Sequence, residues 1–385
     1  LNEFPHLTCC SVTGRSPPPP EHLRSPPPPD RAPAAPLSSP LLVRATMVAH
    51  PEAGGGLANL GNTCFMNSVL QCLVHTQLLH RYLEKRQHSA KCRRRQGEFC
   101  LFCALEDLVQ RTFAQGPRSP AFAPRAIANA LPAIAKGFRL GRQEDAHEFL
   151  RYVLEKLTKE GSAVVETARP PGVTGKYTAL QSWFSGALRS QIQCCHCGHE
   201  SNTQDPFLDL SLELRAVGGR VAPDLDGAMT QFCQEEFLDG ANKYKCEACG
   251  KLRRARKQFL VERPPRHLSV HLKRFSFGEG GGGSGKISAH VAFPATWQLA
   301  RYSAARTRGG SQTPPLPYQL YAVVCHDGCS APRGPAAATP ALHPPLPLRV
   351  LGGSTHSGHY YCYVRSMGKP GHGAAGGGAG GGASG

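Results

Sequence analysis

The sequence predicts an α+β fold in which the N-terminal third is helical and the remainder consists of short strands. Apolar side chains recur at helical spacing between residues 64 and 158, whereas from about Lys176 onward the apolar runs are short and alternate. The strand-rich part also holds two Cys-x-x-Cys-Gly motifs, which are typical of a structural metal site. With 385 residues, 40% of them hydrophobic, the chain can form one large domain with tails.

The hydrophobic pattern predicts individual elements within these two parts. Helices are predicted over residues 64–85, 99–114 and 143–158, and in the last of them one apolar stripe contains Phe149, Leu150, Val153, Leu154 and Leu157. Strands are predicted over residues 189–193, 207–214, 257–261, 267–275, 318–325 and 359–365. Loops or insertions are predicted over residues 278–285, 301–317 and 328–347.

The two ends of the chain have a composition that does not favour folding. Residues 1–55 are rich in proline and repeat Ser-Pro-Pro-Pro-Pro, so we expect them to be extended and disordered, with Met47 a candidate for the true start. Residues 367–385 form a tail of glycine and alanine. The sequence contains neither the apolar run of a signal peptide nor one of about 18 residues that would span a membrane.

The formal net charge of +17 allows a nucleic-acid partner, an acidic membrane surface or a cationic surface without a special partner. Basic residues cluster at 91–95 and 251–257, but aromatic residues are not interleaved with them and no nucleic-acid motif is present. We therefore expect nonspecific contact with nucleic acid at most. Sixteen cysteines without a signal peptide favour an intracellular protein, in the cytoplasm or the nucleus, whose thiols are reduced.

A candidate nucleophile follows the sequence Gly61-Asn62-Thr63. Cys64 comes after this turn, at the start of an apolar helix. Backbone N–H groups at a helix N-terminus stabilise negative charge and favour the thiolate, which is the form that attacks carbonyl carbons. The alternative is that Cys64 is a small buried residue at the start of a helix.

A candidate base lies far along the chain, as is usual for cysteine proteases. His359 begins an apolar strand and follows Gly358, which would allow close access to its imidazole ring. The alternative is a surface histidine or a core histidine with its hydrogen bonds satisfied.

Four segments together resemble the ubiquitin-specific protease family. Residues 56–68 resemble its cysteine box, residues 143–150 its glutamine-led acidic motif, residues 271–275 its signature strand and residues 356–364 its histidine box. Each segment alone is weak evidence, but all four occur in the order of the family. The chain is therefore identified as a member of this family.

The resemblance implies a papain-like cysteine protease core shaped like a hand. The catalytic domain would span residues 56–366. A helical thumb would occupy about 56–160, zinc-bearing β fingers about 176–270, and a β palm the remainder. The cleft between thumb and palm would hold Cys64 opposite His359.

The resemblance also implies the catalytic roles. Cys64 matches the nucleophile, His359 the general base and Asn59 the side-chain donor to the oxyanion, while His356 matches no catalytic residue. The reaction would be hydrolysis of the isopeptide or peptide bond after the C-terminal glycine of ubiquitin, through a thioester acyl-enzyme. A catalytically impaired ubiquitin-binding pseudoenzyme of the same fold is the alternative, and a zinc-dependent nucleic-acid module is a third hypothesis.

Three further residues match substrate-binding positions of the family. Gln143 and Asp145 match positions that line the channel for the arginine-rich ubiquitin tail, and Tyr360 is expected to border the same channel. The alternative for residues 143–148 is a solvated first helical turn, since acidic side chains favour that place. The expected partners are ubiquitin and ubiquitinated proteins.

The two Cys-x-x-Cys-Gly motifs predict a structural zinc site with four sulfur ligands. Each motif provides two sulfurs on a tight turn, and the family has zinc in its fingers at this point. The expected ligands are Cys194, Cys197, Cys246 and Cys249. The alternative is four unrelated buried thiols.

A second metal site is a hypothesis for the N-terminal third. The spacing His-x3-Cys followed by Cys-x-x-Cys could hold zinc between two helices, with His88, Cys92, Cys100 and Cys103 as its ligands. The alternative is a set of core cysteines beside the basic run 93–95.

The pattern departs from the family after His359. The family completes its triad with an Asp or Asn downstream of the histidine box, but neither occurs in this sequence after that position. We expect an incomplete chain that lacks its last strands; a divergent or inactive member of the family is the alternative. Missing strands would leave a sheet edge bare.

Overall fold

The computed structural model describes residues 54–92, 97–114, 120–161, 177–216, 218–276, 285–305, 316–327, 348–351 and 359–365. The chain divides into two compact units, residues 1–48 and 49–385, and every described residue belongs to the second. The predictions for residues 1–53, 328–347 and 367–385, and for His356, lie outside the described residues.

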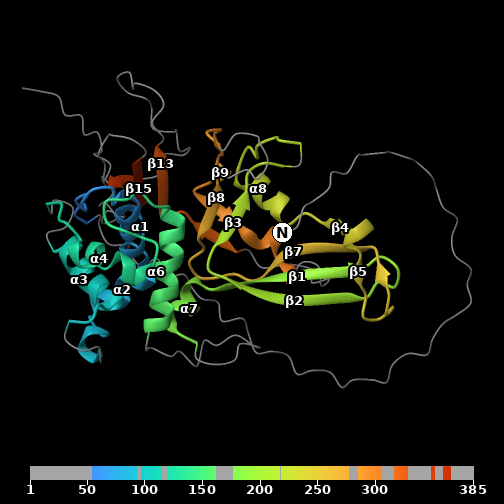
Figure 1. Ribbon diagram of the computed structural model, residues 1–385, viewed down its shortest axis with the longest axis horizontal. Helices are drawn as coiled ribbons and strands as arrows, with labels where there is room; N and C mark the ends of the chain where they lie inside the picture. Colours follow the sequence, from blue (N-terminus) through green and yellow to red (C-terminus); the bar gives the residue numbers. More distant parts are fainter. Residues whose placement is uncertain are drawn as a thin grey trace, which may run out of the picture. The chain divides into compact units, whose positions relative to one another are not determined.

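The first part of the second unit is a helical bundle (Figure 1). Its elements are α1 (Cys64–Val74), α2 (Gln77–Glu84), η1 (Ser89–Lys91), α3 (Leu101–Phe113), α4 (Arg125–Asn129), α5 (Leu131–Ile134) and α6 (Ala146–Glu160). The rings of Phe65 and Phe149 meet edge to face at a centroid distance of 5.6 Å, and both side chains are buried. This contact joins α1 to α6 in the centre of the bundle.

The predicted helix over residues 64–85 is wrong in one respect, because it is two helices. The backbone leaves the helical conformation at Thr76, where ψ is 114°. The Thr76 hydroxyl donates to the carbonyl oxygen of Cys72 at 3.0 Å, so it stabilises the end of α1 while α2 starts in a new direction. The apolar periodicity continues across the break, which is why the sequence does not reveal it.

A four-stranded antiparallel sheet extends from the bundle, in the order β2-β1-β7-β4 (Figure 1). It is preceded by α7 (Ala179–Phe184), and its strands are β1 (Gly186–Cys194), β2 (Glu200–Phe207), β4 (Glu236–Leu238) and β7 (Ala255–Arg263). We call these strands the long sheet. The hairpin of β5 (Tyr244–Lys245) and β6 (Leu252–Arg253) lies in the chain between β4 and β7.

A second hydrophobic core lies beside the base of the long sheet. It includes β3 (Leu210–Glu213), β8 (Val270–Lys273) and α8 (Leu225–Phe232), with β11 (Thr296–Gln298), η5 (Leu299–Tyr302) and β12 (Pro317–Gln319) packed with them. The pairing of β3 with β8 is parallel, and Ser211 lies directly opposite His271. A short pair of β9 (Phe275–Ser276) and β10 (Gly285–Lys286) follows β8.

The remaining described strands form a sheet in the order β13-β15-β14. They are β13 (Ala322–Asp327), β14 (Leu348–Leu351) and β15 (His359–Arg365). Among the described strands β15 is the central strand of this sheet, with β13 on one side and β14 on the other. The short apolar run 348–351, which follows the predicted insertion, supplies the backbone that pairs with it.

The first helix packs on this last sheet. Cys72 of α1 contacts the buried residues Cys362 and Val364 of β15. The two elements that begin with Cys64 and His359 are therefore adjacent, although most of the chain lies between them. Within the described residues, every helix is too short or too polar to cross a bilayer.

Candidate active site

Cys64 is the first residue of α1 and is buried, with 6% of its surface exposed. The turn before it requires two residues with positive φ, Gly61 at 87° and Asn62 at 55°. Glycine and asparagine adopt this conformation at little cost, so the Gly-Asn pair allows the sharp entry into the helix. The sulfur of Cys64 consequently lies at the positive end of the helix dipole.

The side chain of Asn59 is oriented by the same turn. Its Oδ1 accepts from the Thr63 N–H at 2.9 Å and lies 3.0 Å from the Thr63 hydroxyl. With Oδ1 engaged in this way, Nδ2 is the group that Asn59 can offer to another acceptor. The residue is exposed, so a substrate oxygen can reach it.

His359 is half-buried at the start of β15. Burial lowers the pKa of its imidazole below the usual value of 6.5, so the ring is neutral at neutral pH and can accept a proton. The backbone register places Asp327 of β13 directly opposite His359. An acidic residue therefore lies at this level of the sheet, although none follows His359 in the sequence.

Tyr360 follows His359 on β15 and interacts with the start of α6. Its hydroxyl interacts with the Asp145 carboxylate and with the Ala146 N–H. Burial raises the pKa of Tyr360 to about 12, and the charges of Asp145 and Cys64 contribute to the increase. These interactions link the start of β15 to the N-terminus of α6.

Asp145 is the N-cap of α6, and its Oδ1 accepts from the Glu148 N–H at 2.8 Å. The helix therefore starts at Ala146, later than the predicted 143, and Gln143 lies in the exposed segment before it. Asn62 Nδ2 donates to the Gly141 carbonyl at 2.7 Å. This bond fixes the Cys64 turn to the segment that carries Gln143.

His326 is a residue of this site that sequence reasoning missed. Its ring lies 4.6 Å from that of Tyr360 and 5.3 Å from that of Phe275. Burial lowers its pKa, with Lys286 and His359 adding to the decrease and Asp145 opposing it. Only the pairing of β13 with β15 brings His326 opposite Tyr360, and no local pattern in the sequence indicates that pairing.

The four predicted cysteines come together at the far end of the long sheet, two from the end of β1 and the turn after it, and two from the turn between β5 and β6. The sulfurs of Cys194, Cys197, Cys246 and Cys249 all lie within 4.8 Å of one another. Those of Cys197 and Cys246 are 3.7 Å apart, close to the roughly 3.8 Å edge of a tetrahedron with Zn–S bonds of 2.3 Å. The arrangement fits a tetrahedral metal ion.

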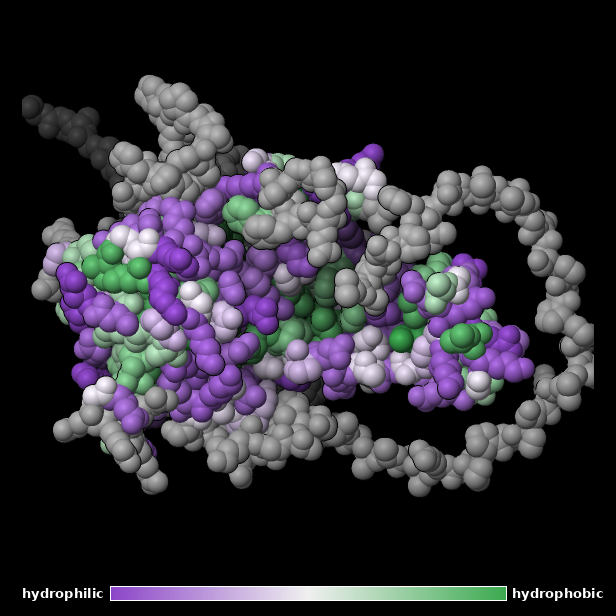
Figure 2. Space-filling view, viewed as in Figure 1, coloured by the Kyte–Doolittle hydropathy of each residue, from purple (hydrophilic) through white to green (hydrophobic). Residues whose placement is uncertain are grey.

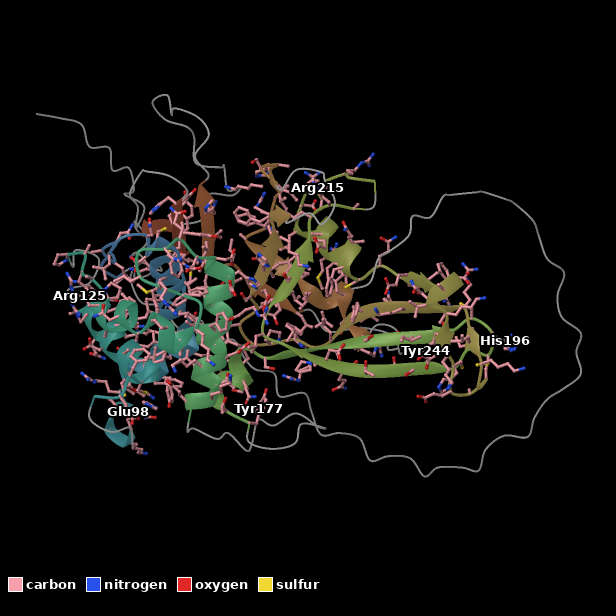
Figure 3. The ribbon with its side chains drawn as sticks, in the orientation of Figure 1. Glu98, Arg125, Tyr177, His196, Arg215 and Tyr244 are labelled. Atoms are coloured by element: carbon pink, nitrogen blue, oxygen red, sulfur yellow. The ribbon has the colours of Figure 1, made fainter. Side chains whose placement is uncertain are left out.

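The two turns that hold these sulfurs have the same construction. Gly198 and Gly250 have φ of 72° and 64°, and their N–H groups donate to the carbonyls of Cys194 and Cys246 at 2.9 Å in both turns. The N–H of Cys197 donates to the Cys194 sulfur. This hydrogen bond is the main reason that the pKa of the Cys194 thiol falls to about 7. His196 projects from its turn away from the strands (Figure 3), as expected for a residue that is not a ligand.

The second predicted cluster also forms, between η1 and α3. The ligand atoms of His88, Cys92, Cys100 and Cys103 lie within 4.8 Å of one another. His88 Nε2 is 3.1 Å from the Cys100 sulfur, and the His88 ring stacks on Phe102 at 4.9 Å. Burial raises the pKa of Cys103 to about 12, which is the penalty that a bound cation would offset.

Two buried carboxylates support this second cluster. Both oxygens of Glu106 accept backbone N–H groups, from His88 and from Ser89, at 2.9 Å each. Glu160 accepts from the Leu101 N–H at 2.9 Å and lies 3.9 Å from the Cys100 sulfur. These carboxylates fix the backbone on both sides of the ligand atoms of the second cluster. By the spacing of its ligand atoms, each of the two clusters can hold zinc.

The comparison with protein families agrees with this geometry. The family model described as ubiquitin carboxyl-terminal hydrolase matches residues 55–370. The chain belongs to the ubiquitin carboxyl-terminal hydrolase family. The resemblance stated from the four sequence segments is thus confirmed, and so is the predicted α+β fold.

Curated relatives in this family come from distant organisms. The human ubiquitin carboxyl-terminal hydrolase 42 is 34% identical over 318 residues, which are 82% of this chain and 20% of that protein. The probable ubiquitin carboxyl-terminal hydrolase 16 of Schizosaccharomyces pombe is 36% identical over 313 residues, 81% of this chain and 59% of that protein. The chain thus spans less than two thirds of the length of these relatives.

Solved structures of the same fold include the SAGA DUB module of Ubp8, Sgf11, Sus1 and Sgf73 bound to monoubiquitin. It matches with a TM-score of 0.60 and 25% identity over 81% of this chain and 61% of the matched chain. The module bound to ubiquitin aldehyde matches with the same TM-score and 24% identity, over 80% and 61% of the two chains.

Proposed function

We propose that this chain is a thiol-dependent deubiquitinase, which hydrolyses the isopeptide or peptide bond after the C-terminal glycine of ubiquitin. The observation that carries the proposal is the meeting of α1 with β15. Cys64 begins the helix, His359 begins the strand, and Cys72 of the helix contacts Cys362 and Val364 of the strand. Family membership supports the same chemistry.

In the first half of the proposed reaction, His359 takes the proton of Cys64 and the thiolate attacks the carbonyl carbon of the terminal glycine. Asn59 Nδ2 and the Cys64 N–H then donate to the oxyanion, and each such donor contributes about 3 kcal/mol of transition-state stabilisation in proteases. The imidazolium of His359 protonates the leaving amine, which departs and leaves a thioester. In the second half, His359 removes a proton from water, which attacks the thioester carbon. The C–S bond then breaks, ubiquitin leaves with a free C-terminal carboxylate, and the proton on His359 returns to the Cys64 sulfur.

We propose that the ubiquitin tail lies along the segment before α6 and the start of β15. Asp145 offers a carboxylate to the arginines of that tail, and Tyr360 keeps the carboxylate in place. Gln143, in the segment before α6, and His326 of β13 border the same region. The solved structures with bound ubiquitin support a ubiquitin partner, and ubiquitinated proteins are the proposed substrates.

We propose that both cysteine clusters hold structural zinc. In each cluster four protein atoms complete the coordination, so the ion would organise the fold and take no part in the hydrolysis. Cys194, Cys197, Cys246 and Cys249 would fix the end of the long sheet. His88, Cys92, Cys100 and Cys103 would fix the segment between α2 and α3.

We further propose that the protein works inside the cell. Among the described residues no cysteine takes part in a disulfide, and several of their thiols lie in the clusters suited to zinc. Reduced cysteines of this kind are typical of intracellular proteins.

The test is covalent labelling by ubiquitin that carries an electrophile in place of its C-terminal carboxylate. The wild-type chain is expected to form a covalent adduct whose mass exceeds that of the free chain by one ubiquitin. Cys64→Ala is expected to form no adduct. An adduct would require both an activated thiol and a formed ubiquitin site. A zinc-loaded chain that binds ubiquitin without labelling would refute the proposed catalysis and identify a pseudoenzyme.

A further inference from the structure

The first turn of α6 meets the β3–β8 pair through two stacked histidine rings. The centroids of His147 and His271 are 3.7 Å apart, and the ring planes are inclined by 12°. His147 Nε2 lies 2.8 Å from Asp209 Oδ2, and His271 Nδ1 lies 2.8 Å from Ser211 Oγ. The four side chains form a continuous contact from the helical bundle to the second hydrophobic core, which we call the histidine junction.

The histidine junction is sheltered from solvent. Only 20% of the His147 side-chain surface and 11% of the Asp209 side-chain surface are exposed to solvent. Hydrogen bonds to charged groups in such surroundings are stronger than those at an open surface. The junction therefore links the first turn of α6 to the β3–β8 pair through partly buried polar contacts.

The charges at the junction favour the stack at neutral pH. Burial, followed by the proximity of His147, lowers the pKa of His271 to about 4. His271 is consequently neutral, so the two rings can stack without repulsion. The negative charges of Asp145 and Asp209 raise the pKa of His271 and so oppose this decrease, whereas the positive charge of Lys273 adds to it.

The same turn of α6 carries the carboxylate that we assign to the substrate channel. Asp145 precedes His147 by two residues, and its carboxylate contacts the Tyr360 hydroxyl of β15. One turn of helix is thus held on one side by Asp209 and His271 and on the other by the strand that begins with His359. A shift of this turn would move Asp145 relative to that strand.

We propose that His147 is a positioning residue for ubiquitin recognition. By its bond with Asp209 and its stack on His271, it holds the first turn of α6 so that the Asp145 carboxylate faces the channel beside Tyr360. This inference rests on the proposed deubiquitinase function, because Asp145 is assigned to the ubiquitin tail there. His147 itself touches neither the reacting atoms nor the tail.

The test compares His147→Ala with His147→Gln on a ubiquitin substrate with a fluorogenic C-terminal amide. Alanine removes both contacts, so KM is expected to rise about tenfold, the change produced by loss of one hydrogen bond to a charged group, with kcat within about twofold. Glutamine can still donate to Asp209, so KM is expected to return to within about threefold of wild type. His290→Ala, at an exposed histidine outside the site, is the matched control and should leave both constants unchanged.

Amide hydrogen exchange provides a second measurement that does not require activity. The amides of residues 146–149 are expected to exchange about tenfold faster in His147→Ala than in wild type, and at the wild-type rate in His147→Gln. An unchanged KM in His147→Ala, or a glutamine variant as impaired as the alanine variant, would overturn the inference. If the wild-type chain hydrolyses no ubiquitin substrate, the proposed function fails, and unchanged exchange in His147→Ala would then overturn the positioning role separately.

Discussion

Replacing Glu106 by glutamine should weaken the cluster between η1 and α3 without touching any of its ligands. Glu106 is fully buried, with 0% of its surface exposed, and each of its oxygens accepts one backbone N–H at 2.9 Å. Glutamine has the same shape, but only one of its terminal atoms is an acceptor. The other is an NH₂ group, which would face the N–H of either His88 or Ser89.

The magnitude follows from these two bonds. A hydrogen bond to a charged group stabilises a protein by about 1.5–3 kcal/mol, and a buried donor left without an acceptor costs about 1–3 kcal/mol. Glu106→Gln loses one such bond and weakens the other, so we expect the free energy of unfolding to fall by about 2–3 kcal/mol. The His88 backbone would also be released, so the cluster should lose its metal at a lower chelator concentration than in wild type.

Urea unfolding and metal analysis after chelator titration measure the two effects. Glu98→Gln is the matched control, because Glu98 lies in the same part of the chain and is exposed (Figure 3). It should change the free energy of unfolding by less than about 0.5 kcal/mol. A Glu106→Gln variant that unfolds and retains metal like the control would refute the reasoning.

Three further predictions concern the channel, the base and the long sheet. Because burial lowers the pKa of His359, the acid limb of kcat/KM for a ubiquitin substrate should have its midpoint below pH 6.5, and a midpoint at or above 6.5 would contradict the assignment. Asp145→Asn keeps the helix cap but loses the charge, so steady-state kinetics should show KM raised about tenfold with the melting temperature unchanged; an unchanged KM would remove Asp145 from the channel. Cys249→Ser should lose one zinc ion per chain in metal analysis, whereas Cys195→Ser, at an exposed cysteine within the first turn, should lose none; equal zinc in both variants would exclude the four-sulfur site.

The sequence predicts best those parts of the fold that depend on local spacing. The stripe from Phe149 to Leu157 is on α6, and the Cys-x-x-Cys-Gly motifs form the turns that bring four sulfurs together. In both cases the spacing along the chain already fixes which side chains share a face or a turn. The order of the four family segments likewise identifies the family without any structural information.

Features that depend on long-range pairing could not be predicted in the same way. His271 is opposite Ser211 only because β3 and β8 are parallel, and His326 is opposite Tyr360 only because β13 pairs with β15. Many registers are compatible with such short alternating runs, and packing of distant residues selects among them. The histidine junction and the contribution of His326 are therefore visible only in the folded chain.

Hydrophobic surface is also unevenly distributed at the end of the long sheet. Phe237 and Leu252 are exposed to 53% and 64% of their surface, although they lie on strands, and Figure 2 shows hydrophobic residues among hydrophilic ones at this end. The guanidinium of Arg254 lies 4.2 Å from the centre of the Phe237 ring. This contact shields part of the ring from water and moderates the cost of its exposure.

The packing of α1 on β15 has a consequence for the synthesis of the protein. Proteins emerge from the ribosome N-terminus first, at about 5–20 residues per second, so α1 is complete long before β15 exists. During that interval the side of α1 around Cys72 has no strand to cover it, and His359, the proposed base, has not yet been synthesised. The proposed hydrolysis would therefore begin only after β15 has been synthesised and has packed on α1, and until then this side of the helix stays exposed.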